Sequence, residues 1–177
     1  MRPIQMVDLK QQYAKIKSEV DAALEEVINT ATFIQGPAVA QFSDHLQKYL
    51  NANHVIPCAN GTDALQIALM GLGLQPGDEV ITPSFTYVAT TEVIALLRMK
   101  PVFVEVDPKT FNIDPSSIEK AITGKTKAIV PVHLYGQPAD MAPIMDIARR
   151  HNLFVIEDTA QAIGAEYTFP DGRSSKA

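Results

Sequence analysis

The sequence predicts an α/β fold of three layers, in which helices cover both faces of a mainly parallel sheet. Short apolar runs with little polar alternation are separated by segments whose apolar residues recur every three or four positions. Such runs are typical of strands buried on both faces, and the helices between them supply the crossovers that parallel strands need. The runs lie at 55–58, 79–82, 102–106, 128–132 and 153–156, and the helical patterns lie at 62–72, 87–98, 115–122 and 140–151.

The first fifty residues have a different pattern from the rest of the chain. Two amphipathic helical patterns, at 8–28 and at 39–50, are separated by a Gly36-Pro37 break. We therefore expect residues 1–50 to form an N-terminal helical segment and residues 51–177 to form the large domain. After Gly164 the sequence is turn-like, with no pattern of a terminal helix or strand, so we expect the chain to stop within the fold.

Composition excludes several classes of protein. The net charge is -5 with acidic and basic residues interspersed, so no basic stripe indicates a nucleic-acid partner. No apolar run approaches membrane-spanning length and no signal-peptide core is present, which predicts a cytoplasmic protein. Cys58 is the single cysteine, and we expect it to be inert within a buried strand. The four histidines lack metal-ligand spacing, so we expect no metal site.

The first segment that carries chemistry is 59–65, which follows the first apolar run and opens a predicted helix. In an open parallel sheet, ligands bind beyond the carboxyl ends of the strands. Gly61 allows a ligand to approach the backbone closely, and the amides at the helix start, with the Thr62 hydroxyl, suit a phosphate group. Taken alone, an ordinary helix cap explains this segment at least equally well.

The second segment follows the second apolar run and contains Phe85 and Tyr87. A planar ligand at the strand end could stack on one of these rings. Taken alone, the segment is better explained by packing in the core.

The third segment places Asp158 after the last apolar run, with Gln161 three residues further on. A carboxylate beside a pyridine nitrogen stabilises the protonated ring, because opposite charges attract strongly in a dry site. The protonated ring is then a stronger electron sink, and the Gln161 carboxamide could reach another polar edge of it. A helix N-cap is the simpler alternative for Asp158.

Together the three segments indicate a flat, phosphorylated cofactor, and here the chain resembles a known family. It is similar to the DegT/DnrJ/StrS sugar aminotransferases, which are fold-type I pyridoxal-phosphate (PLP) enzymes. The resemblance covers nearly the whole chain and implies the large domain of that fold, preceding a small C-terminal domain. The segments that carry it are DLKQQYAKI, TFIQGPAVAQF, CANGTDALQIAL, GDEVITPSFTYVATTEVI, TKAIVPVHLYGQPADM and VIEDTAQAIGA.

The resemblance implies a role for five residues. Gly61 and Thr62 match the phosphate-binding turn of the family, and Tyr87 matches the aromatic residue that stacks on the pyridine ring. Asp158 matches the catalytic acid paired with the ring nitrogen. Gln161 matches the position beside the phenolic oxygen of the ring.

Two further residues, His133 and Tyr135, follow the fourth apolar run at the expected ligand edge. We expect them to line the sugar pocket, although a tyrosine at a strand end is often structural.

The chain departs from the family pattern in one respect, because it contains no match to the stretch with the Schiff-base lysine. That lysine is expected beyond Ala177, and we expect Lys176 to be a solvated loop residue. Without the lysine there is no good general base for the proton shift, so we expect the 177-residue chain to be inactive alone.

The function that the resemblance implies is transfer of an amino group from glutamate to a nucleotide-linked keto-sugar, and UDP is the expected nucleotide. The similarity is greatest to the 3-keto-sugar (uronic acid) aminotransferases of surface polysaccharide biosynthesis, and a homodimer is expected. Two alternatives stay open: a PLP-dependent sugar dehydratase of the same family, and a non-catalytic fragment that binds PLP or a nucleotide sugar. A nicotinamide-binding domain is disfavoured, because no Gly-x-Gly-x-x-Gly motif follows a strand.

Overall fold

The computed structural model describes residue 4 and residues 6–177, which divide into two compact units. The first unit extends to Lys48 and includes Ala52–Pro57, and the second comprises Tyr49–Asn51 and Cys58–Ala177. No helix in the described part of the chain has both the length and the apolar content that a bilayer-spanning segment needs.

The first unit is built from helix α1 and most of helix α2. Helix α1 (Leu9–Thr30) is capped by the Asp8 carboxylate, which accepts the amide hydrogen of Gln11, and it ends at Ala31 in the left-handed conformation. Helix α2 (Pro37–Leu50) begins with a proline, whose fixed φ suits the first helical position. Neither helix has a fully buried residue.

The second unit contains a four-stranded parallel sheet with the order β2-β1-β3-β4. The strands of this sheet are β1 (Glu79–Pro83), β2 (Lys100–Val104), β3 (Thr126–Ile129) and β4 (Phe154–Val155). The helices of the unit are α3 (Gly61–Gly71), α4 (Ala89–Leu96), α5 (Pro115–Ala121) and α6 (Met141–His151), and a short 3-10 turn, η1, spans Leu134–Gly136. Every predicted helix is therefore present, with its ends shifted by at most two residues.

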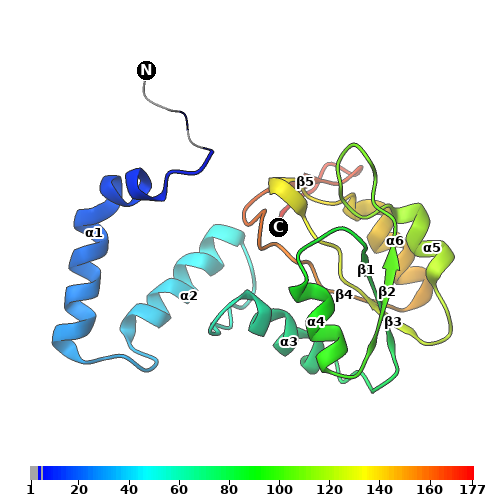
Figure 1. Cartoon of the computed structure of the whole chain (residues 1–177), viewed down its shortest axis with the longest axis horizontal. Coiled ribbons are helices and arrows are strands. Elements are labelled where there is room, and N and C mark those ends of the chain that lie inside the picture. Colours follow the sequence, from blue (N-terminus) through cyan, green and yellow to red (C-terminus); the bar gives the residue numbers. More distant parts are fainter. Residues whose placement is uncertain (1–3, 5) are drawn as a thin grey trace. The chain divides into compact units, whose positions relative to one another are not determined.

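Two separate apolar clusters show that the sheet is buried on both faces. On one face, Val80 of β1 and Ala128 of β3 pack with apolar residues of α3 and α4. On the other face, the next residues along these strands, Ile81 and Ile129, pack with residues of α5 and α6. Figure 1 shows α4 on one side of the strands and α5 with α6 on the other. This arrangement confirms the predicted three-layer α/β fold.

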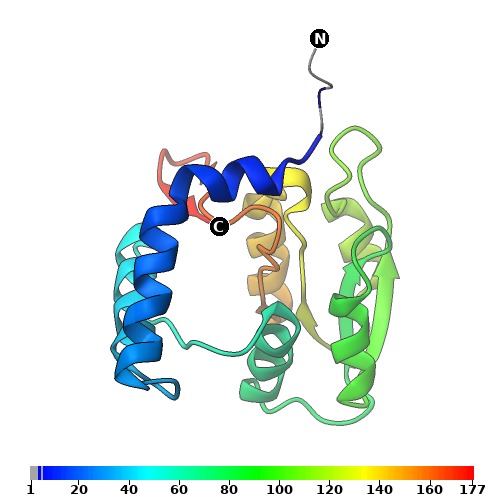
Figure 2. The same cartoon turned by 60° about the vertical axis from the view of Figure 1, so that its left-hand side comes forward.

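The predicted strand at 55–58 is absent. This stretch is an irregular link between α2 and α3, which can be followed in Figure 2, and Cys58 is exposed rather than buried. A strand exists only where its backbone pairs with a neighbour, and Pro57 has no amide hydrogen to donate. The apolar run was therefore wrongly predicted to be a strand.

The C-terminal stretch also differs from the prediction, because it forms an antiparallel hairpin. Strands β5 (Glu166–Thr168) and β6 (Ser174–Lys176) are joined by a Pro-Asp-Gly turn in which Gly172 has a φ of 85°. Such a turn is a recognised hairpin signal, since glycine adopts positive φ without strain. Lys176 is thus a strand residue, and its Nζ donates to the Tyr49 carbonyl oxygen at 2.9 Å and lies over the Tyr49 ring.

The amino end of the sheet is held by a buried carboxylate, Glu79 of β1. Its oxygens accept hydrogen bonds from the Thr123 hydroxyl at 2.5 Å and from the Lys100 ammonium at 2.9 Å. The Thr123 hydrogen bond, followed by that of Lys100, lowers the pKa of Glu79 below its usual value. The carboxylate therefore links β1, β2 and the loop before β3.

We expect Ile144→Ala to lower the free energy of unfolding by about 2–5 kcal/mol, because it opens a cavity in the core between the sheet and α6. The neighbouring Met145 is 36% exposed, so Met145→Ala provides a matched control with an expected loss of under about 1 kcal/mol. Urea denaturation measures both values. Equal losses would contradict the assignment of Ile144 to this core.

We expect Glu79→Gln to lower the free energy of unfolding by about 1.5 kcal/mol at pH 7, because two hydrogen bonds to a charged group are weakened. Since folding lowers the pKa of Glu79, its stabilisation is fully present above the unfolded value near 4.5 and is lost as the pH falls through the folded value. The difference between the wild type and the variant, measured by denaturation at several pH values, should shrink below pH 4.5. A difference that grows there would refute this role.

Candidate active site

A cavity of about 380 Å³ lies at the carboxyl ends of the strands. Segments after β1, β3 and β4 contribute to its wall, together with the start of α3. Its volume lies in the range of small-molecule sites. The residues that line it are Gly61, Thr62, Ala64, Leu65, Thr86, Tyr87, Ala89, Val132, Glu157, Asp158, Thr159, Ala160 and Gln161. The five residues predicted to bind a cofactor are all among them.

One end of the cavity is formed by the N-terminus of α3. The Asn60 side chain accepts the amide hydrogen of Asp63, and the Asn60 carbonyl oxygen accepts that of Ala64. The amides of Gly61 and Thr62 precede the first hydrogen bond within the helix and remain available as donors. A Cβ atom built on Gly61 meets no atom within 4 Å, so open space lies in front of this residue. The arrangement suits a phosphate group.

The cavity wall also contains Asp158, which is only 9% exposed. Its backbone continues the parallel pairing beyond the end of β4. The Asp158 amide donates to the Pro131 carbonyl oxygen at 2.9 Å, and the Asp158 carbonyl oxygen accepts from the His133 amide at 3.0 Å. The carboxylate accepts one hydrogen bond on each oxygen, from the Ala160 amide at 3.2 Å and from the Thr90 hydroxyl at 2.8 Å. Asp158 is thus fixed in both backbone and side chain.

The Gln161 side chain is oriented by a residue of η1. The Tyr135 amide donates to Gln161 Oε1 at 3.0 Å, so the Nε2 group of Gln161 is the end that can donate to a ligand in the cavity. Tyr135 has a φ of 55°, which is uncommon for a residue with a bulky side chain. Its ring is 70% exposed and contacts the ring of Phe111 edge-on, and it is not part of the cavity wall.

His133, predicted to line the sugar pocket, is instead completely buried and outside the cavity wall. Its Nδ1 accepts the amide hydrogen of Ala139 at 2.9 Å, so in this network Nε2 carries the proton and donates to the Glu157 carboxylate at 2.8 Å. His133 therefore orients Glu157, which lines the cavity beside Asp158. Both ring nitrogens have partners within the protein.

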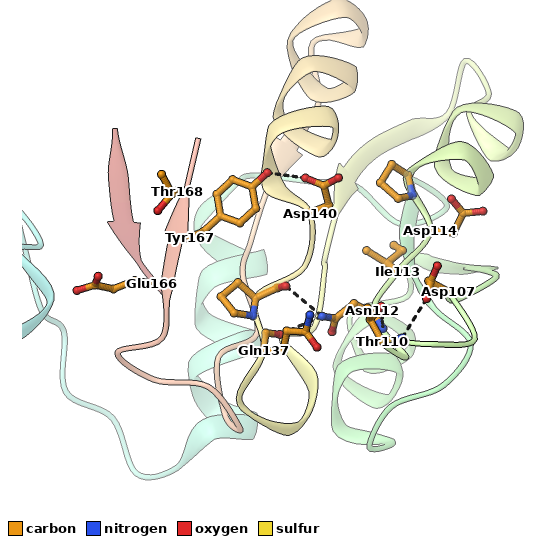
Figure 3. A pocket seen from close by; sticks show the side chains of 12 residues that line it. Asp107, Thr110, Asn112, Ile113, Asp114, Gln137, Asp140, Glu166, Tyr167 and Thr168 are labelled. Carbon is orange, nitrogen blue, oxygen red and sulfur yellow. Dashed lines mark hydrogen bonds between the residues drawn. The ribbon is translucent and has the colours of Figure 1, made fainter. Parts of the chain in front are cut away.

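A larger cavity, of about 540 Å³, lies beside the β5–β6 hairpin (Figure 3). Its wall contains four acidic residues and no lysine or arginine, which disfavours a phosphate group. Its polar side chains bond to one another: the Tyr167 hydroxyl donates to Asp140, and the Asn112 amide donates to the carbonyl oxygens of Gln137 and Pro138. Burial, with a smaller effect of Asp140, raises the pKa of Tyr167. None of the predicted site residues lines this cavity.

Sequence reasoning missed Glu157, which lines the smaller cavity, and Thr90, which contacts Asp158 from outside the cavity wall. Glu157 directly precedes Asp158, and no sequence motif distinguishes it from other carboxylates at strand ends. Thr90 lies 68 positions before its hydrogen-bond partner Asp158, and no spacing in the sequence indicates that contact.

Comparisons with known proteins agree with this geometry. The chain is 54% identical over 164 residues to the UDP-2-acetamido-2-deoxy-3-oxo-D-glucuronate aminotransferase of Pseudomonas aeruginosa. The matched region covers 93% of this chain and 46% of that protein. A solved structure of S. venezuelae DesV has 41% identity and a TM-score of 0.88, over 92% of this chain and 44% of that chain. A Bacillus subtilis NtdA structure with bound cofactor PMP has 45% identity and a TM-score of 0.82, and the match covers 85% of this chain and 34% of that chain.

The chain thus spans about half the length of the curated relatives it matches, or less. The model of the DegT/DnrJ/EryC1/StrS aminotransferase family, a family of PLP-dependent enzymes, matches residues 14–172. That range includes every residue placed in the cavity wall, together with the sheet that positions them. By this match, and by 54% identity over most of its length, the chain belongs to the DegT/DnrJ/EryC1/StrS aminotransferase family.

Proposed function

We propose that the protein transfers an amino group from glutamate to a UDP-linked keto-sugar, using PLP held in the cavity at the carboxyl ends of the strands. The observation that carries the proposal is that a helix N-terminus with available amides and a buried carboxylate line the same small cavity. PLP has a phosphate at one end and a ring nitrogen at the other, and these two groups require those two partners.

The residues present fit PLP, and each has a separate task in the proposal. The amides of Gly61 and Thr62 hold the phosphate at the start of α3. The Tyr87 ring, 72% exposed at the cavity wall, offers a flat apolar surface to the pyridine ring. The Asp158 carboxylate holds a proton on the ring nitrogen, and the Gln161 Nε2 group donates to the phenolic oxygen. When bound, PLP supplies an electron sink for negative charge at the substrate carbon.

The identity of the substrate is proposed from the relatives. The Pseudomonas aeruginosa relative is an aminotransferase for a UDP-linked 3-oxo sugar, and its identity of 54% supports the same class of substrate here. Glutamate as the amino donor and surface polysaccharide as the end product belong to this proposal. The direct test incubates the full-length protein with PLP, glutamate and a UDP-linked 3-keto-sugar. An aminated sugar supports the proposal, and release of water without amination would support a dehydratase instead.

We also propose that the protein is a cytoplasmic homodimer, in which residues 51–177 form the PLP-binding large domain and residues 1–50 a helical segment. Support comes from the apolar side chains that α1 leaves exposed, because large exposed apolar surfaces are typical of interaction sites. The side chains concerned are Leu9, Tyr13, Ile16, Leu24 and Ile28. A second copy of the chain is the partner that we propose for them.

We expect Asp158→Asn to lower kcat by about 100-fold or more in the full-length protein, because the neutral amide cannot stabilise charge on the ring nitrogen. Asp171→Asn is the matched control, since Asp171 lies in the β5–β6 turn and outside the cavity. Steady-state kinetics with glutamate and the keto-sugar measure both. Activity of Asp158→Asn within a few-fold of wild type would show that the assigned role is wrong.

We expect Gly61→Val to weaken PLP binding by about tenfold or more while leaving the fold intact, because the new side chain enters the open space assigned to the phosphate. Gly71→Val, at the other end of α3, is the control, and a Cβ there also meets no atom within 4 Å. Equilibrium dialysis gives the two dissociation constants. The same weakening in both variants would place the phosphate elsewhere.

A further inference from the structure

We propose that Thr90 is a positioning residue for Asp158, whose carboxylate it holds in the orientation required toward the cofactor ring. The inference rests on the proposed function, since it assigns a purpose to a contact with the carboxylate that faces PLP. Thr90 belongs to none of the three segments that sequence reasoning selected, although it follows the second of them closely.

The contact joins two parts of the fold that are distant in sequence. Thr90 is the second residue of α4, and its Oγ1 lies 2.8 Å from Asp158 Oδ2. An ionised carboxylate only accepts hydrogen bonds, so the hydroxyl is the donor. Thr90 is 1% exposed and is absent from the cavity wall, whereas Asp158 is part of that wall. Thr90 therefore acts on a ligand only through Asp158.

The carboxylate depends on this hydroxyl for its orientation. The second oxygen, Oδ1, accepts the Ala160 amide hydrogen at 3.2 Å, which is a longer bond between residues two positions apart. The hydroxyl bond is the shorter one and comes from a helix packed in the core beside the sheet. Thr90 is β-branched, so its own rotamer is restricted and its hydroxyl is held in place. Without the hydroxyl, Oδ2 loses its donor and only the longer Ala160 bond still orients the carboxylate.

The start of α4 adds to the same effect. A helix N-terminus carries partial positive charge, and Thr90 brings the Asp158 carboxylate to the first turn of α4. Val88, the residue before α4, makes no side-chain cap to this end of the helix. A buried threonine that only filled space would need neither the hydroxyl nor this placement.

The test compares Thr90→Val, which keeps the shape and removes the hydroxyl, with Thr90→Ser, which keeps the hydroxyl. Thr126→Val is the control, because Thr126 is also buried and its hydroxyl accepts a hydrogen bond from the Thr123 amide, at the opposite end of β3 from the cavity. If Thr90→Val does not fold, Thr90→Ala replaces it. All variants are made in the full-length protein with PLP.

Four quantities are measured: kcat with glutamate, KM for glutamate, the PLP dissociation constant, and the pH dependence of the absorption band of bound PLP. We expect Thr90→Val to lower kcat by about 10- to 100-fold with KM changed less than about twofold, as for a misplaced catalytic group. The pH midpoint of the absorption band should shift in Thr90→Val and return in Thr90→Ser. Thr126→Val should lose stability only.

Three results would overturn the inference. If kcat and the absorption profile were unchanged in Thr90→Val while the wild type is active, Thr90 would not position Asp158. The proposed function would be unaffected by that result. Equal effects of Thr90→Val and Thr126→Val would mean that the hydroxyl contributes only to stability. Failure of the wild-type protein to bind PLP would overturn the proposed function together with this inference.

Discussion

The arrangement of the site depends on the parallel pairing that continues past the ends of β3 and β4. The Asp158 amide donates to the Pro131 carbonyl oxygen, and the His133 amide donates to the Asp158 carbonyl oxygen. These two bonds extend the register of the sheet to Asp158, the residue that faces the cavity. Because a parallel ladder fixes each residue against a particular neighbour, the position of the Asp158 carboxylate follows from the sheet as a whole.

The cavity combines two helix N-termini with the buried carboxylate of Asp158. Amides at the start of α3 face it directly, and the start of α4 is linked to Asp158 through Thr90. Both helices begin at the edge of the sheet where ligands of α/β folds bind. The same small cavity thus contains hydrogen-bond donors that suit an anion and a carboxylate acceptor that suits a cation. This is the feature that favours a cofactor with a phosphate and a ring nitrogen.

The loops around the site contain unusual backbone conformations. Phe111 and Tyr135 have φ values of 61° and 55°, their rings contact each other, and Phe85 contacts Phe111. Non-glycine residues with positive φ cost free energy, so the surrounding contacts must hold them. For Tyr135 the consequence is direct, since its amide holds the Gln161 side chain. Backbone geometry in η1 therefore sets which end of a carboxamide faces the cavity.

The sequence by itself determined the layers of the fold, the helices α1–α6 and the strands β1–β4 of the described residues, and the cofactor-binding candidates, because apolar periodicity and strand-end motifs are local patterns. The strand predicted at 55–58 is wrong, since pairing depends on a neighbour, and the hairpin around Gly172 was not predicted although its turn residues are present. Only the tertiary structure showed that His133 is buried against Glu157 and that Thr90 reaches Asp158. Contacts between residues far apart in the chain arise from packing of the whole sheet, and no local spacing encodes them.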